Sequence, residues 1–167
     1  MHDDFSALFT YNRWADDRVL TACRALSPEA YTRELPGGMT SLRATLVHIA
    51  AATHAWSRRV QGQTVTILAP EAELPTIEDA ARILAEANDV FARLVATLTP
   101  ERLAGIFTYR NLKNEEKRLP FWAVLRHVVN HASYHRGQVA VKLKRLGVEP
   151  PATDLVFWAI EQTTRSA

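Results

Sequence analysis

The chain has 167 residues, of which 47% are apolar and 23% are charged, a composition typical of a soluble globular protein. Its 20 cationic and 18 acidic residues are interspersed and give a formal net charge of +2, which argues against a nucleic-acid partner. No apolar run approaches the roughly 20 residues of a membrane span, and the N-terminus lacks a secretory signal, so we expect one domain over residues 1–167, no membrane partner and a cytoplasmic location.

Two amphipathic helices are predicted in the first part of the chain, because apolar residues recur there at intervals of three and four. The first covers residues 5–26, and Pro28 is expected to end it. The second begins at Thr40 or Ser41, either of which can cap it, and continues until Gly62.

The third predicted helix has the most regular apolar pattern in the chain. It follows a loop over residues 63–75, and Thr76 with Asp79 resembles a capping arrangement at its first turn. Thr99 and Pro100 are expected to end it.

The pattern changes between residues 106 and 119, where β-favouring ends flank a polar centre. This segment predicts a short hairpin or an extended loop. Pro120 suits the first turn of a fourth helix, which ends at Gly147, and a short terminal helix is expected from Asp154.

The four long amphipathic segments match one another closely enough in length to lie side by side. The predicted fold class is therefore all-α, a four-helix bundle with a short hairpin or extended loop before the fourth long helix. The single cysteine, Cys23, faces the interior of the first helix and is predicted to be a small apolar filler.

Three histidines follow one another at intervals of four on the last long helix. Four helical positions bring a side chain back to within about 40°, so His131 and His135 project from one face, with His127 one turn earlier. Two imidazoles placed in this way can bind one metal ion. His48 lies in the apolar pattern of an earlier helix among small residues and could supply a third ligand.

A simpler interpretation of these residues competes with a metal site, and one kind of metal chemistry is disfavoured. Each histidine could be separately hydrogen-bonded, as His54 is expected to be, since it points about 120° away from His48. Zinc-peptidase chemistry is disfavoured, because Ala132 follows His131 where an HExxH motif carries its glutamate.

The sequence resembles the DinB family, also called DinB/YfiT-like putative metalloenzymes, over nearly its whole length. Members are four-helix bundles, often dimers, that bind a divalent metal through one histidine of the second helix and an HxxxH pair of the fourth. By motif the resemblance implies the ligands His48, His131 and His135; the family often has a further histidine at the position of Tyr134. The segments that carry the resemblance are YNRWADDRVL, LRATLVHIAAATHAW, HVVNHASYHRGQ and GVEPPATDL.

The resemblance also implies a function. Three neutral imidazoles leave a coordination position open, and a bound metal lowers the pKa of water or of a thiol there. Relatives include transferases and isomerases that use thiols such as bacillithiol or mycothiol. We therefore expect a divalent metal, zinc or nickel ahead of iron or manganese, that activates a thiol or water for transfer to a small electrophile. The alternative is a non-catalytic, stress-related helical homodimer with a stabilising or vestigial metal.

Further polar residues are candidates for partners of the metal ligands. His127 and Gln138 share the ligand face, and Asn12 interrupts the apolar stripe of the first helix. A hydrogen bond that ties two helices together explains Asn12 equally well. Arg136 lies off this face and is expected in an ion pair, and Trp14, opposite the main stripe, indicates a second buried surface such as a homodimer contact, or a singly exposed aromatic.

Overall fold

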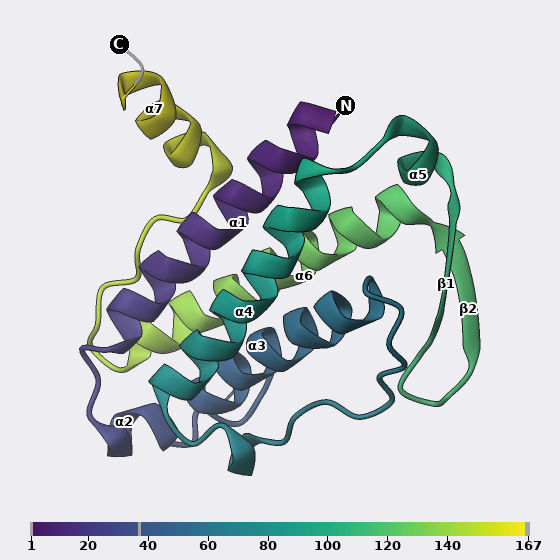
Figure 1. Ribbon diagram of the computed structural model, residues 1–167. Coiled ribbons are helices and arrows are strands. Elements are labelled where there is room, and N and C mark those ends of the chain that lie inside the picture. Colours follow the sequence, from purple (N-terminus) through teal and green to yellow (C-terminus); the bar gives the residue numbers. More distant parts are fainter. Residues whose placement is uncertain (1, 37, 166–167) are drawn as a thin grey trace.

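Four long helices form a bundle in the computed structural model, which describes residues 2–36 and 38–165 (Figure 1). Helix α1 packs against α4 and α6, and α3 packs against the same two helices, so α1 and α3 lie diagonally opposite each other. The all-α, four-helix-bundle prediction is confirmed. The bounds are His2–Cys23 for α1, Leu42–Arg59 for α3, Ile77–Ala96 for α4 and Phe121–Arg145 for α6.

The capping residues expected from the sequence set several helix ends. The Ser41 hydroxyl accepts a hydrogen bond from the backbone N–H of Ala44 at 2.9 Å, so Ser41, and not Thr40, caps α3. Thr76 and Asp79 form the predicted capping box of α4. Gly147 follows α6 with a φ of 79°, the left-handed conformation that glycine adopts without strain.

Two short helices, α2 (Pro28–Thr32) and α5 (Pro100–Ala104), were not predicted. Both begin at a proline that was expected only to end a longer helix. A serine or threonine precedes each proline and caps the new helix, because proline fits the first helical position. A 3-10 turn, η1 (Glu71–Glu73), also interrupts the predicted loop over residues 63–75.

The predicted hairpin is present as strands β1 (Ile106–Arg110) and β2 (Glu116–Pro120), which pair antiparallel. Tyr109 packs on Trp56 of α3, with ring centroids 4.8 Å apart, so the hairpin lies over the C-terminal end of α3. Its other end continues directly into α6.

A buried polar network joins α1, α4 and α6 inside the bundle. One guanidinium N–H group of Arg136, Nη1, donates to Asn12 Oδ1 and to Asp16 Oδ1, at 2.8 Å in each case. The amide groups of Asn12 and Asn88 donate to Asp16 Oδ2. The side chains of Asp16 and Arg136 are each only 2% exposed, so the expected ion pair of Arg136 lies in the core.

Helix α7 (Leu155–Arg165) stands beside α1 and projects away from the four long helices (Figure 1). Trp14 Nε1 donates to Glu161 Oε2 at 3.0 Å, and the Trp158 ring lies 6.2 Å from that of Tyr11. The surface around Trp14 is therefore covered in part by α7 of the same chain. None of the helices described over residues 2–165 combines the length and apolar character of a membrane span.

Candidate metal centre

Three histidine side chains from two neighbouring helices converge between α3 and α6. One ring nitrogen of His48, from α3, and one each of His131 and His135, from α6, lie within 4.8 Å of one another. His48 Nε2 and His131 Nε2 are 3.3 Å apart. The His135 ring centroid lies 4.5 Å from that of each of the other two, so the residues expected to meet do meet.

The spacing of these nitrogens fits a tetrahedral cation. Two imidazole nitrogens at 2.0–2.1 Å from one ion, with a tetrahedral angle between them, lie about 3.4 Å apart. The 3.3 Å between His48 Nε2 and His131 Nε2 agrees with this value. A hydrogen bond between two imidazoles also has this length, but it would engage only two of the three converging nitrogens. The donor set therefore fits a divalent metal such as zinc.

Gln138 holds the ring of His135 in place. Gln138 lies one turn after His135 on α6, and its Oε1 is 2.9 Å from His135 Nδ1. An amide oxygen only accepts hydrogen bonds, so Nδ1 carries the proton and Nε2 keeps the lone pair that a metal requires. Gly38, with a φ of 67°, packs close to this amide, and a Cβ atom there would lie 3.7 Å from Gln138 Nε2.

Burial lowers the pKa of two of the three clustered histidines, His131 and His48. Burial first, and the neighbouring His135, His48 and His127 in addition, together lower the pKa of His131 to about 4. Burial, and secondarily His135, also lowers the pKa of His48. Neutral imidazole is the form that coordinates a metal, so His48 and His131 need little deprotonation before binding.

Acidification from pH 6.5 to about pH 4 is expected to destabilise the metal-free protein. The unfolded chain protonates its histidines near the ordinary pKa of 6.5, whereas folded His131 stays neutral until about pH 4. The unfolded state therefore binds more protons in this window, and the free energy of unfolding falls as the pH falls. Urea unfolding at a series of pH values measures the slope, which should be smaller in His131→Gln. Equal slopes for the two proteins would contradict this assignment.

His127 lies beside the cluster and is not bonded to it. Its ring centroid is 5.5 Å from that of His131 and 5.3 Å from that of Trp56, with which it makes an edge-to-face contact. The side chain is exposed, and partial burial lowers its pKa. Among the hydrogen bonds of the described residues, none joins His127 to a ligand histidine, so its predicted role as a direct partner of the ligands has no hydrogen bond to support it.

Asn12 and His54 lie away from the three converging nitrogens. Asn12 bonds to Asp16 and Arg136 in the core, so the alternative considered above, a bond that ties two helices together, describes its contacts. His54 stands outside the cluster, as expected, and lines a separate surface hollow with residues of α4. Sequence reasoning did not find Asp16, because a single acid on an amphipathic helix gives no sign that it is buried.

A cavity of about 470 Å³ adjoins the cluster at His48. It lies between α3 and the loop that precedes α4, and its walls are mostly aliphatic or small. The Glu71 carboxylate at its edge forms an ion pair with Arg43, with Oε2 and Nε 3.0 Å apart. The other lining residues are Met39, Thr40, Ala44, Val47, Ala51, Leu68, Ala69 and Pro70. Of the small residues of α3 that line this cavity beside His48, Ala44 was expected from the sequence and Ala51 was not.

Comparison with known proteins gives matches over the whole chain. The model of the DinB family matches residues 1–165. Protein DinB of Bacillus subtilis (strain 168) is 26% identical, and the match covers 100% of both chains. Protein YizA of the same organism is 25% identical, over 89% of this chain and 91% of YizA.

Two solved structures share the fold. A DinB-like protein from Bacillus cereus superposes with a TM-score of 0.67 at 19% identity, over 90% of this chain and 95% of its own. The DinB-like protein YjoA from Bacillus subtilis gives a TM-score of 0.62 at 15% identity, over 88% of this chain and 97% of YjoA. At these identities the likeness supports the fold alone.

Proposed function

The chain belongs to the DinB family, and we propose that it is an enzyme that holds one divalent metal ion on three histidines and transfers a small thiol to an electrophile. The proposed ligands are His48, His131 and His135. The proposed ion is zinc or nickel ahead of iron or manganese.

One observation carries this proposal: the cluster supplies three protein ligands and adjoins a cavity. Among the described residues, no fourth histidine, cysteine, aspartate or glutamate belongs to the cluster. Structural zinc sites are closed by four protein ligands, whereas catalytic sites keep a position for water or substrate. The cavity at His48 gives a substrate room to approach this position.

Two residues around the cluster have separate roles in the proposed reaction, one that orients a ligand and one that accepts a proton. When bound, a divalent cation lowers the pKa of a thiol held in its open position. Gln138 fixes the ring of His135, and His127, whose lowered pKa favours the neutral ring near pH 7, accepts the thiol proton at a ring nitrogen. The sulfur then forms a bond to the electrophilic carbon, and the leaving group departs with the electron pair of the broken bond.

The cavity favours an electrophile with a small, uncharged, apolar body. Its walls are built mainly of aliphatic side chains from α3 and from residues 68–70. Its carboxylate, Glu71, is already neutralised by Arg43, so no unpaired charge there selects a charged substrate.

A turnover screen tests the proposal. Protein loaded in turn with zinc, nickel, iron or manganese is mixed with low-molecular-weight thiols and small apolar electrophiles, and thiol consumption is followed. We expect metal-dependent turnover that His48→Ala abolishes and that His127→Gln reduces by about 100-fold with metal content unchanged. A metal that raises the melting temperature of the protein without any turnover would contradict the enzyme proposal and favour a stabilising metal.

Replacing Gln138 with leucine is expected to weaken metal binding by roughly 10- to 100-fold, because His135 then loses the acceptor that orients its ring. Competition with a chromophoric chelator measures the affinity. Gln138→Glu is the matched control, since a carboxylate still accepts the Nδ1 proton and should retain most of the affinity. Equal losses in the two variants would show that the hydrogen bond is not the cause.

A further inference from the structure

The guanidinium of Arg59 is buried at the C-terminal end of α3. The residue is 7% exposed, and no ion pair joins it to an acidic side chain in the part of the chain that the structure describes. Nη2 donates to the carbonyl oxygen of Val65 at 2.6 Å, and within residues 2–36 and 38–165 nothing accepts a hydrogen bond from the buried Nε. Buried cations are rarely left without an anion, so this guanidinium can bind one.

Two aromatic rings frame this guanidinium. Its carbon, Cζ, lies 4.9 Å from the centre of the Trp56 ring and 5.2 Å from that of Tyr109 on β1. Cation–π contacts offset part of the free energy lost when a charge is buried, but they leave the N–H donors in the guanidinium plane unsatisfied. The planar fork of an arginine matches the two oxygens of a carboxylate. The group that best completes the surroundings of Arg59 is therefore a carboxylate.

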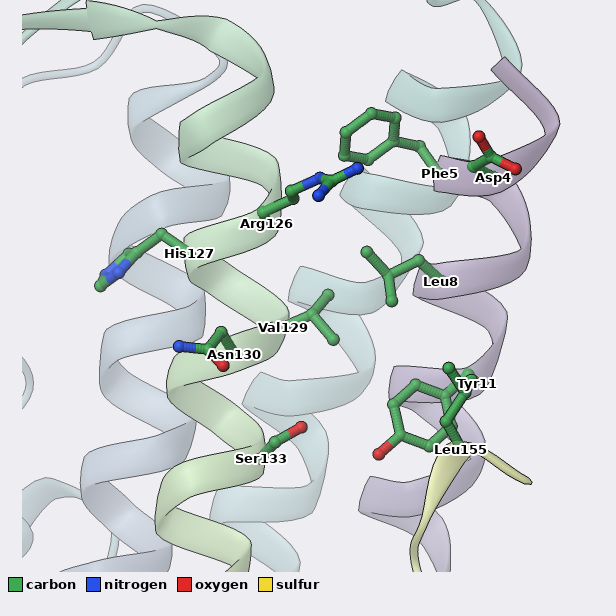
Figure 2. Close-up of a pocket in the computed structure, with 10 residues that line it drawn as sticks. All are labelled: Asp4, Phe5, Leu8, Tyr11, Arg126, His127, Val129, Asn130, Ser133 and Leu155. Atoms are coloured by element: carbon green, nitrogen blue, oxygen red, sulfur yellow. The ribbon is translucent and has the colours of Figure 1, made fainter. Parts of the chain in front are cut away.

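Trp56 and His127 connect Arg59 to the histidine cluster, and we call these two residues the aromatic shelf. Their ring centroids lie 5.3 Å apart, and that of His127 lies 5.5 Å from that of His131. Each step from the guanidinium to the nearest proposed ligand is thus shorter than 6 Å. In Figure 2, His127 points away from Phe5 of α1, and its contact with Trp56 places it on the side of α3.

The helical geometry of α3 also directs Arg59 toward the cluster. Successive positions turn by about 100°, which places Arg59 within about 20° of the direction of His48, three turns further along. Only Ala52 and Ala55 stand between them on this face, so no large side chain of α3 separates the two. Long side chains of a helix lean toward its N-terminus, and that of Arg59 leans back over Trp56 in this way.

We propose that Arg59 binds a carboxylate of the thiol substrate, whose body lies along the aromatic shelf and whose sulfur reaches the metal position. This inference rests on the proposed function and names the chemical class of its thiol. The cavity assigned to the electrophile lies toward the N-terminal end of α3, whereas Arg59 lies at the other end of that helix. The two substrates therefore approach the cluster from opposite sides, and His127, the proposed proton acceptor, stands on the side of the thiol.

The charges of the two sides assign the carboxylate to the thiol. The Glu71 carboxylate beside the electrophile cavity is paired with Arg43, so that cavity offers no free cation to an acidic substrate. On the other side, Arg126 points over Phe5, and this leaves Arg59 as the buried cation next to the aromatic shelf. A cation that is already desolvated binds a carboxylate more strongly than an exposed one does.

A matched pair of peptides tests this inference without turnover. Each peptide is an N-acetylated, S-methylated cysteine followed by two to four glycines, which spans roughly 10–17 Å when extended. One member of each pair ends in a free carboxylate and the other in an amide. Isothermal titration calorimetry on the full chain should show that the acid binds about 10-fold or more tightly than the amide, because the acid makes charge-assisted hydrogen bonds.

Arg59→Gln is expected to abolish this preference, and Arg59→Lys, which keeps the charge but not the planar fork, to retain only part of it. The matched control is Arg58→Gln. Arg58 is the exposed neighbour whose Nε donates to Gln63 Oε1 at 2.6 Å, so the variant loses the same charge at the surface and should keep the full preference. Circular dichroism establishes that each variant is folded, and the comparison of acid with amide on the wild type needs no variant at all.

Equal affinities of the wild type for acid and amide, or binding of neither, would overturn the inference and leave Arg59 as a structural cation. An acid preference that persists in folded Arg59→Gln would overturn it as well. An acid preference without any thiol turnover would support the Arg59 site and contradict only the proposed function. Turnover of free thiols with no acid preference would do the reverse.

Discussion

Replacing His131 with alanine is expected to weaken the binding of zinc by at least about 100-fold, more than the loss of a residue that only orients a ligand. His131 lies close to both other ligands, since its Nε2 is 3.3 Å from that of His48 and its ring centroid is 4.5 Å from that of His135. Without it, two imidazoles remain, and two ligands do not form a tight site. Competition titration against a chromophoric chelator measures the change.

The control for this prediction is His54→Ala. His54 lies on the same helix as His48 but outside the cluster, so its removal tests whether any histidine of this surface contributes to binding. We expect wild-type affinity for zinc in this variant. If His131→Ala bound zinc as tightly as the wild type does, the cluster would not be the metal site.

Replacing Asp16 with alanine is expected to lower the free energy of unfolding by roughly 3–5 kcal/mol. The change would leave the Arg136 guanidinium in the core, 2% exposed, without its carboxylate. It would also remove the acceptor that Asn12 and Asn88 share. Urea unfolding, monitored by circular dichroism, measures the loss.

Two further variants separate this mechanism from a simple cavity effect. Asp16→Leu combined with Arg136→Met removes both charges and should recover much of the lost stability, because no unpaired charge stays buried. Asp89→Ala removes an ion pair with Arg13 in which both side chains are about half exposed, and it should have little effect. A double variant no more stable than Asp16→Ala would show that burial of the unpaired charge is not the main cause.

The helical fold could be predicted from the sequence because its signals are local. Apolar spacing located the four long helices, and the caps at Ser41 and Thr76 marked two of their starts. The short helices that begin at Pro28 and Pro100 were not predicted. A serine or threonine followed by proline can end one helix and also begin the next, and only the first of these two roles was expected.

The candidate site was predicted in part. The spacing of His131 and His135 predicted that they share one face of a helix. The convergence of His48 on them rested on the resemblance, since the sequence of α3 does not show which helix packs against it. Asp16 looks like its exposed neighbour Asp17 in the sequence, and only the packing of three helices distinguishes them. The cavity beside His48 depends on the conformation of the loop before α4, and this loop has no periodic sequence pattern from which its conformation could be predicted.

The X-ray absorption spectrum of the zinc-loaded protein tests the central claim most directly. The account predicts one zinc per chain with three imidazole nitrogens at about 2.0–2.1 Å and one further light ligand from solvent or substrate. The same measurement on His48→Ala should show one imidazole fewer or no bound zinc. A wild-type spectrum with fewer than three imidazoles, or with sulfur from Cys23, would contradict the account.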